Sequence, residues 1–172
     1  MTDGRSILAT IVQSSTVELF RGLSLAVAPR PQSVVQVRVD ETYVGASIAF
    51  SGKSMNGNLL LWVPKELLSS PRATAPISSK PNDLTRELSN QLLGRIKNRL
   101  LTYKVELHLG LPSAAAQSAR SSRLDERQEN ADFAFQSLRG DVWVTLRGRV
   151  DYSAIAYSGG TVTANEGDVI LF

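Results

Sequence analysis

Residues 83–100 (DLTRELSNQLLGRIKNRL) carry the pattern that most constrains the fold of this chain, an apolar stripe at helical spacing. At roughly 100° per residue, its aliphatic side chains fall within one half of the helix circumference. They are Leu84, Leu88, Leu92, Leu93, Ile96 and Leu100. The pattern predicts a long helix that buries this stripe in a core, with Asn82 or Asp83 as its N-cap.

The opposite side of this helix is polar. Asp83, Glu87, Asn90 and Gly94 cluster there on the helical wheel, so we expect them to face outward together. Glycine inside a helix costs on the order of 1 kcal/mol relative to alanine, and Gly94 therefore indicates that a neighbouring element or another protein approaches closely. Taken alone, Glu87 and Asn90 are most simply interpreted as part of an ordinary solvated helix face.

Two arginines do not fit the stripe. On the wheel, Arg99 lies inside the apolar arc and Arg95 lies at its edge. Arginine stems can lie along apolar surface while the charged head reaches water. We therefore expect the stems of both arginines to lie along the apolar surface near the end of the helix, with their charged heads in water.

Further helix and strand patterns lie on both sides of the central helix. The first twenty residues have mainly helical apolar spacing and end near Gly22, a typical helix stop. Runs typical of β-strands occupy residues 33–39, 43–50, 58–63, 102–111, 132–138, 141–152 and 168–172. Turn residues at 51–57 predict a hairpin, and a short helical turn is expected at 64–68.

This order of elements predicts the fold class α+β. It lacks the regular strand–helix alternation of doubly wound folds. We expect a largely antiparallel β-sheet packed with an N-terminal helix and a long central helix. The length of 172 residues predicts a single domain, 1–172, with an exposed loop rich in serine and proline at 69–82. Residues 113–130 form a charged insertion, which is either a flexible excursion or an exposed helix.

Several kinds of site are excluded by the residues that the chain lacks. It has no cysteine, which excludes disulfides, thiolate zinc sites and cysteine nucleophiles. The one histidine, His108, cannot form a histidine-rich metal site, and strand alternation places it on a polar face. Gly52-Lys53-Ser54 resembles the end of a phosphate loop, but the glycine that this motif requires is Ser47 and no helix pattern follows. We expect no metal site.

The net charge and the hydropathy of the chain limit the classes of partner that we expect. The formal net charge of +3 comes from 19 basic and 16 acidic residues mixed along the chain, which is too small an excess to argue for nucleic acid. No apolar run is long enough to cross a membrane, and the N-terminus lacks the pattern of a secretory signal. We expect a cytoplasmic protein that binds neither nucleic acid nor a membrane.

The spacing Asp83-x3-Glu87-x2-Asn90, followed after 21 residues by Pro112, resembles the signature of the CheC/CheX family of chemotaxis phosphatases. ELSNQLLGRIKNRL is similar to the helix of that family, with Gly94 on its glycine, and LHLGLPS is similar to the strand that leads into its proline. VGASIAFSG and NGNLLLWVPKEL resemble its glycine-ended hairpin and following short helix. The resemblance covers residues 33–113, and the presence of one motif favours the single-site CheX-like type.

The resemblance implies a CheC-like fold and a hydrolase that removes the aspartyl phosphate of a CheY-like response-regulator receiver domain, in chemotaxis or another two-component signalling pathway. The catalytic pair of the family falls on Glu87 and Asn90. Asn90 would orient the attacking water, and Glu87 would dock to the lysine of the receiver. Asp83 and Gly94 would lie in the docking face. The resemblance also implies a homodimer and no cofactor of its own, with Mg²⁺ in the active site of the partner receiver.

Two other interpretations stay open. A non-catalytic CheX-like signalling module would bind a receiver or another partner and would share the fold and the apolar stripe. A structural or nucleic-acid contact through Arg95, Lys97, Arg99 and Lys104 is less favoured, because these side chains spread around the helix and lack interleaved aromatic residues.

Overall fold

The computed structural model describes residues 3–31, 39–70, 80–116 and 129–156 of the chain. The helices are α1 (Gly4–Gly22), α2 (Lys65–Leu68), α3 (Pro81–Leu101) and α4 (Tyr152–Ala156). The strands are β1 (Ala28–Pro29), β2 (Tyr43–Ser51), β3 (Met55–Pro64), β4 (His108–Leu109), β5 (Ser113–Ala114), β6 (Glu129–Gln136) and β7 (Val142–Val150).

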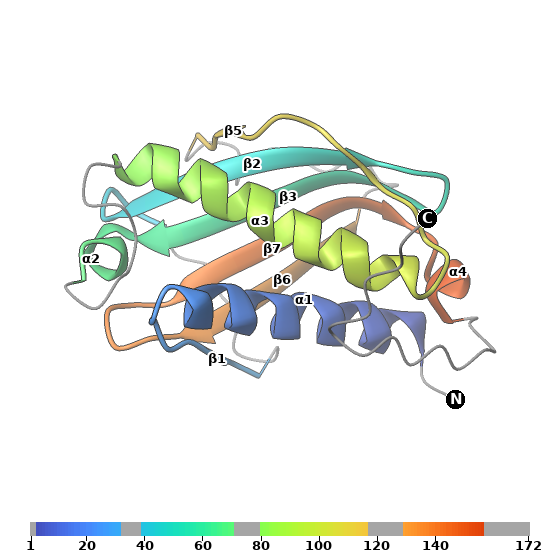
Figure 1. Cartoon of the computed structure of the whole chain (residues 1–172), viewed down its shortest axis with the longest axis horizontal. Helices are drawn as coiled ribbons and strands as arrows, with labels where there is room; N and C mark the ends of the chain where they lie inside the picture. Colours follow the sequence, from blue (N-terminus) through green and yellow to red (C-terminus); the bar gives the residue numbers. More distant parts are fainter. Residues whose placement is uncertain (1–2, 32–38, 71–79, 117–128, 157–172) are drawn as a thin grey trace, which may run out of the picture.

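These strands form one antiparallel sheet with the order β1-β6-β7-β3-β2-β4, and β5 also pairs with β2. Two hairpins, β2–β3 and β6–β7, supply its long strands, and β3 pairs with β7 at the centre. The long helices α1 and α3 lie side by side across one face (Figure 1). The predicted α+β class, with an N-terminal helix and a long central helix on an antiparallel sheet, is confirmed.

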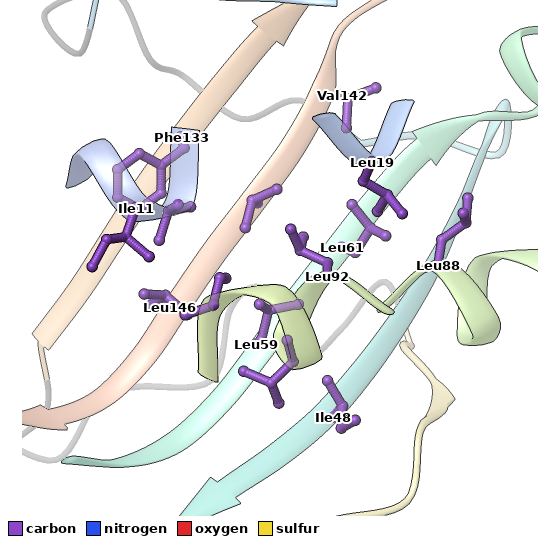
Figure 2. Packing of buried hydrophobic residues seen from close by; sticks show 14 of the residues in the cluster. Ile11, Leu19, Ile48, Leu59, Leu61, Leu88, Leu92, Phe133, Val142 and Leu146 are labelled. Carbon is purple, nitrogen blue, oxygen red and sulfur yellow. The ribbon is translucent and has the colours of Figure 1, made fainter. Parts of the chain in front are cut away.

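The core lies between this helix pair and the sheet. Alternate residues of the central strands point toward the helices, as Leu59 and Leu61 of β3 do, and they meet the buried side of α3 at Leu88 and Leu92 (Figure 2). Burying each side chain of this size stabilises the fold by roughly 1.5–3 kcal/mol. The predicted stripe is confirmed, because five of its members are buried and Leu84 packs against the same core.

Arg95 and Arg99 lie in the stripe because they face α1. Their side chains stay partly exposed, at 44% and 35%, as predicted, but their guanidinium groups pair with Glu18 of α1, which was not predicted. The Arg99 guanidinium donates to both carboxylate oxygens of Glu18 at 2.6 Å and to the Ser14 hydroxyl at 2.7 Å. Arg95 lies 3.8 Å from the same carboxylate. One glutamate of α1 therefore compensates two cations of α3 beside the apolar contact of the two helices.

The helix α3 begins earlier than predicted. Lys80 is its N-cap and makes no side-chain cap hydrogen bond, and Pro81 occupies the first turn. Proline is favoured there because its fixed φ suits the helix and its missing N–H is not needed. The prediction that Asn82 or Asp83 caps the helix is therefore wrong.

The strand predicted at 102–111 is mostly irregular. Lys104 takes a left-handed φ of 58°, and the Val105 N–H donates to the Leu100 carbonyl at 3.1 Å, which closes the end of α3. Val105 is buried beneath this turn, so its apolar alternation reflects core packing rather than a long ladder. Only the short strands β4 and β5 pair with β2. Pro112 lies between them and has no N–H to donate to a ladder.

Other predicted boundaries shift by a few residues. The first helix is confirmed as α1, although Ser24, with a φ of 61°, takes the left-handed position after it rather than Gly22. Strands at 43–50, 58–63, 132–138 and 141–152 correspond to β2, β3, β6 and β7, and the helical turn at 64–68 corresponds to α2. The strand at 168–172, and all but one residue of the strand at 33–39, lie outside the described residues.

The two predicted loop segments are only partly described. Residues 71–79 of the loop at 69–82 lie outside the described residues, and Ser70 at its start is buried rather than exposed. Residues 117–128 of the insertion at 113–130 also lie outside them. Its described ends belong to β5 and β6, so at those ends neither a flexible excursion nor a helix is found. Among the described helices, none has the length and apolarity that crossing a membrane requires.

A row of two tryptophans flanked by two small residues crosses the sheet on the face away from α1 and α3. The register pairs Gly45 with Trp62, Trp62 with Trp143, and Trp143 with Ala134. Both indoles are buried. A β-carbon on Gly45 would stand 2.3 Å from two carbons of the Trp62 ring, so the ring lies directly over this glycine. The residue at position 45 must therefore stay small.

We predict that Glu18→Gln lowers the free energy of unfolding by about 1 kcal/mol, because Arg99 and Arg95 lose a charged partner that they share in a partly buried position. Glu66→Gln is the matched control, since Glu66 pairs with Arg139 at 3.1 Å but is 71% exposed. Its loss should stay below about 0.5 kcal/mol. Urea unfolding of both variants measures the difference, and equal losses would contradict the prediction.

Candidate functional site

The candidate site lies on the outward face of α3. Glu87 and Asn90 are both exposed, and the two residues between them, Leu88 and Ser89, are buried. The Ser89 hydroxyl donates to the Arg86 carbonyl at 2.7 Å, so burying it leaves no unsatisfied donor. Because Leu88 packs in the core, the rotation of α3 is fixed and the predicted pair faces outward, one turn apart on the same side.

Glu87 has a neutral partner. Its Oε1 accepts a hydrogen bond of 2.8 Å from the Nε2 of Gln91, one helical turn further on. The described helices contain four acidic residues, and the other three form ion pairs with arginine. Of these four acidic residues, only Glu87 forms no ion pair with the described part of the chain. Gln91 lies outside the predicted motif, although its spacing of four residues from Glu87 is a usable signal.

Asn90 presents a free carboxamide. Its side chain is exposed and forms no hydrogen bond or ion pair with the described part of the chain. A carboxamide can donate and accept hydrogen bonds at the same time, and it carries no charge that would repel an anion. Asn90 is therefore available to orient a small polar molecule against an anionic group brought by a partner.

Gly94 leaves room for another molecule. A β-carbon built on it meets no atom within 4 Å, so no element in the described part of the chain explains the glycine by close packing. Of the two explanations that the sequence left open, a neighbouring element within the described chain is excluded. The bare helix surface at Gly94 lies on the face that carries Glu87 and Asn90, and it allows a partner to come close.

Asp83 lies in the first turn of α3 and forms an ion pair with Arg86. Its charge is already compensated, unlike that of Glu87. Pro112, the last residue of the motif, is half-buried and directly precedes β5, a strand that contacts α3. The structure therefore brings the strand that follows the proline to the helix that carries the predicted pair.

The described surroundings of the pair contain neither a metal-binding cluster nor a cavity lined by the pair. No cluster of histidine and acidic residues that could hold a metal ion occurs among the described residues. His108 is exposed in β4, as predicted. A cavity of about 560 Å³ lies at the C-terminal end of α1, between Leu25, Leu67 and Leu138, and neither Glu87 nor Asn90 lines it. Within the described part of the chain the pair stands on exposed helix surface, where it is accessible to groups from a partner.

Comparison with solved structures identifies the fold. A CheC-like superfamily protein from Shewanella sp. PV-4 has a TM-score of 0.64 and 15% identity, covering 83% of this chain and 97% of the other. The chemotaxis protein CheX from Vibrio vulnificus has a TM-score of 0.62 and 14% identity, covering 80% and 96%. A structure of the CheX-CheY-BeF₃-Mg²⁺ complex from Borrelia burgdorferi matches with a TM-score of 0.63 and 14% identity, covering 83% and 97%.

The chain therefore has the CheC-like fold, as the resemblance implied. No family model matches the sequence, and no curated protein matches it. At these identities the likeness concerns the arrangement of the elements.

We predict that Gly94→Ala raises the free energy of unfolding by about 0.5–1 kcal/mol, because alanine favours the helix and its methyl group meets open space. Gly45→Ala is the opposite control, since the added methyl group would overlap the ring of Trp62 and should destabilise the fold. Thermal or urea unfolding measures both variants. A loss of stability in Gly94→Ala would show that the position is not open.

Proposed function

We propose that this chain is a CheX-like member of the CheC/CheX family and a phosphatase that hydrolyses the aspartyl phosphate of a CheY-like receiver domain. The observation that carries the proposal is the outward face of α3, where Asn90 has no partner in the described chain and Glu87 keeps its charge. The open space at Gly94 lies on the same face. The fold supports the proposal, since solved structures with it include a CheX protein in complex with CheY.

The reaction needs little from the phosphatase. The aspartyl phosphate of a receiver is labile, and the receiver supplies a divalent cation and a lysine that neutralise charge on the phosphoryl group. Hydrolysis chiefly lacks a water held in line with the bond that breaks. The water oxygen bonds to phosphorus, the bond from phosphorus to the aspartate oxygen breaks, and the aspartate leaves as a carboxylate. The proton that the attacking water loses is taken up by an oxygen of the phosphate product.

Asn90 would supply the missing orientation. Its Oδ1 would accept a hydrogen bond from the attacking water, and its Nδ2 would donate to a phosphoryl oxygen. A carboxylate in this position would repel the phosphate, and a neutral amide avoids that cost. The role is analogous to that of the glutamine that orients water in GTP hydrolysis.

Glu87 would set the register of docking by pairing with the receiver's lysine. Gly94 would let the receiver approach the helix. Asp83 would lie at the rim of the docking face, with its charge held by Arg86. Neither Asp83 nor Gly94 takes part in the chemistry.

The proposal extends to the assembly. The chain would use no cofactor of its own, because Mg²⁺ would reside in the partner receiver. A homodimer is a further part of the proposal that rests on the family resemblance. A single domain over 1–172 and a cytoplasmic location are also proposed, from the length and the hydropathy of the sequence. Chemotaxis and other two-component signalling pathways are both compatible with a receiver partner.

We predict that Asn90→Ala lowers the accelerated rate of receiver dephosphorylation by about tenfold or more, because the side chain would no longer orient the attacking water. The fold should be retained, since the Asn90 side chain is exposed. Asn98→Ala is the matched control, another exposed asparagine of α3 two turns further on, and it should retain full activity. The measurement is the decay of a receiver domain phosphorylated by acetyl phosphate, with each variant added.

Equal activity of Asn90→Ala and the wild-type protein would overturn the role of Asn90. A wild-type protein that binds beryllofluoride-activated receivers but accelerates the decay of none would instead establish the alternative, a non-catalytic CheX-like signalling module.

A further inference from the structure

We propose that Gln91 is a positioning residue, which holds the Glu87 carboxylate for a cation of the partner without neutralising it. This inference deepens the proposed function, because it rests on the docking role of Glu87. It concerns a residue outside the Asp83-Glu87-Asn90 spacing, and it comes from the hydrogen bond that the structure places on Glu87.

The contact restrains Glu87 in one orientation. The Nε2 of Gln91 donates to Oε1 of Glu87 at 2.8 Å, and both side chains are exposed. Free glutamate side chains lose rotamer entropy when they dock, so a glutamate that is already restrained loses less. The hydrogen bond occupies one carboxylate oxygen and leaves lone pairs of the other for an ammonium group.

The neutrality of Gln91 sets Glu87 apart from the other acidic residues of the described helices. Glu18 pairs with Arg99, Glu66 with Arg139 and Asp83 with Arg86. Each of these carboxylates has an arginine partner from its own chain. Glu87 has instead an amide, which fixes its position and preserves its charge.

Asp83 also helps to leave Glu87 without a cationic partner, because it pairs with the arginine next to Glu87 in the sequence. Arg86 directly precedes Glu87 and is the nearest cation to it in the sequence of α3. Its ion pair with Asp83, three residues back, directs the guanidinium toward the start of the helix. The pairs Asp83–Arg86 and Glu87–Gln91 together leave one negative charge beside Asn90 that no cation of the described residues pairs with, and that a cation of a partner would compensate.

A lysine at position 91 would suit the helix better than glutamine does. Glutamate followed by lysine four residues later is the charge order that stabilises helices most. The substitution would therefore stabilise α3 or leave it unchanged while supplying Glu87 with a cation. Stability and docking should move in different directions, which a purely structural role of Gln91 does not predict.

The test compares Gln91→Lys with Asn98→Lys, which adds the same charge to the exposed surface of α3 about 16 Å from position 87 along the axis. The probe is a CheY-like receiver domain activated with beryllofluoride and Mg²⁺, and the readout is its dissociation constant. Gln91→Lys should raise Kd about three- to tenfold, and Asn98→Lys should change it less than about twofold. Gln91→Met, which keeps the length and removes the donor, should raise Kd by about two- to threefold.

Kinetics and unfolding complete the test. For Gln91→Lys the KM for the phosphorylated receiver should rise with Kd, kcat should change less than about twofold, and the melting temperature should not fall. A Kd for Gln91→Lys within about twofold of the wild-type value, or an equal rise in Asn98→Lys, would overturn the role of Gln91.

The two proposals fail in different ways. A wild-type protein that binds the activated receiver without accelerating hydrolysis would overturn the phosphatase activity, and the Kd values would still decide the role of Gln91. Loss of hydrolysis in Asn90→Ala together with unchanged Kd in Gln91→Lys would support the phosphatase and overturn the positioning role. A wild-type protein that binds no activated receiver would overturn both.

Discussion

The packing of α3 onto the sheet is the contact on which the rest of this structure depends. Leu88, Leu92 and Ile96 enter the core formed with the central strands, and this fixes the rotation of the helix about its axis. A helix with a fixed rotation has a fixed outward face, so the same burial that stabilises the domain also determines that Glu87 and Asn90 point away from it. The candidate site and the core are two sides of one helix.

The charged residues of α3 are paired differently on its two sides. On the side toward α1, Arg95 and Arg99 share Glu18, and these ionic contacts lie beside the apolar contact of the two helices. On the outward side, the charge of Asp83 is compensated by Arg86 and that of Glu87 is not. A surface that keeps a charge uncompensated gives up a small amount of helix stability, and proteins commonly accept such a cost at functional sites.

The parts of the fold that could be predicted were those with a strong local pattern. The stripe of α3 and the helix α1 show a helical repeat directly in the sequence, and β2, β3, β6 and β7 are runs of strand-forming residues bounded by turn residues. The prediction of a strand at 102–111 was wrong for most of its length. Val105 and Leu107 are buried in the turn after α3, and their burial gives the same alternation of apolar and polar residues as a paired β-strand would. The prediction of the N-cap was wrong because the helix begins at Pro81, before the polar residues that the sequence offered as caps.

By itself the sequence determined which residues can share a helix face, because the spacing of side chains on a helix is a property of local backbone geometry. The spacing of Glu87, Asn90 and Gly94 is enough to place them on one face of a helix. Only the tertiary structure decided what those residues contact. The pairing of Arg99 with Glu18 joins positions 81 residues apart, and the open space at Gly94 depends on where every other element lies. The preserved charge of Glu87 depends on the rotamers of Gln91 and Arg86, which spacing permits but does not select.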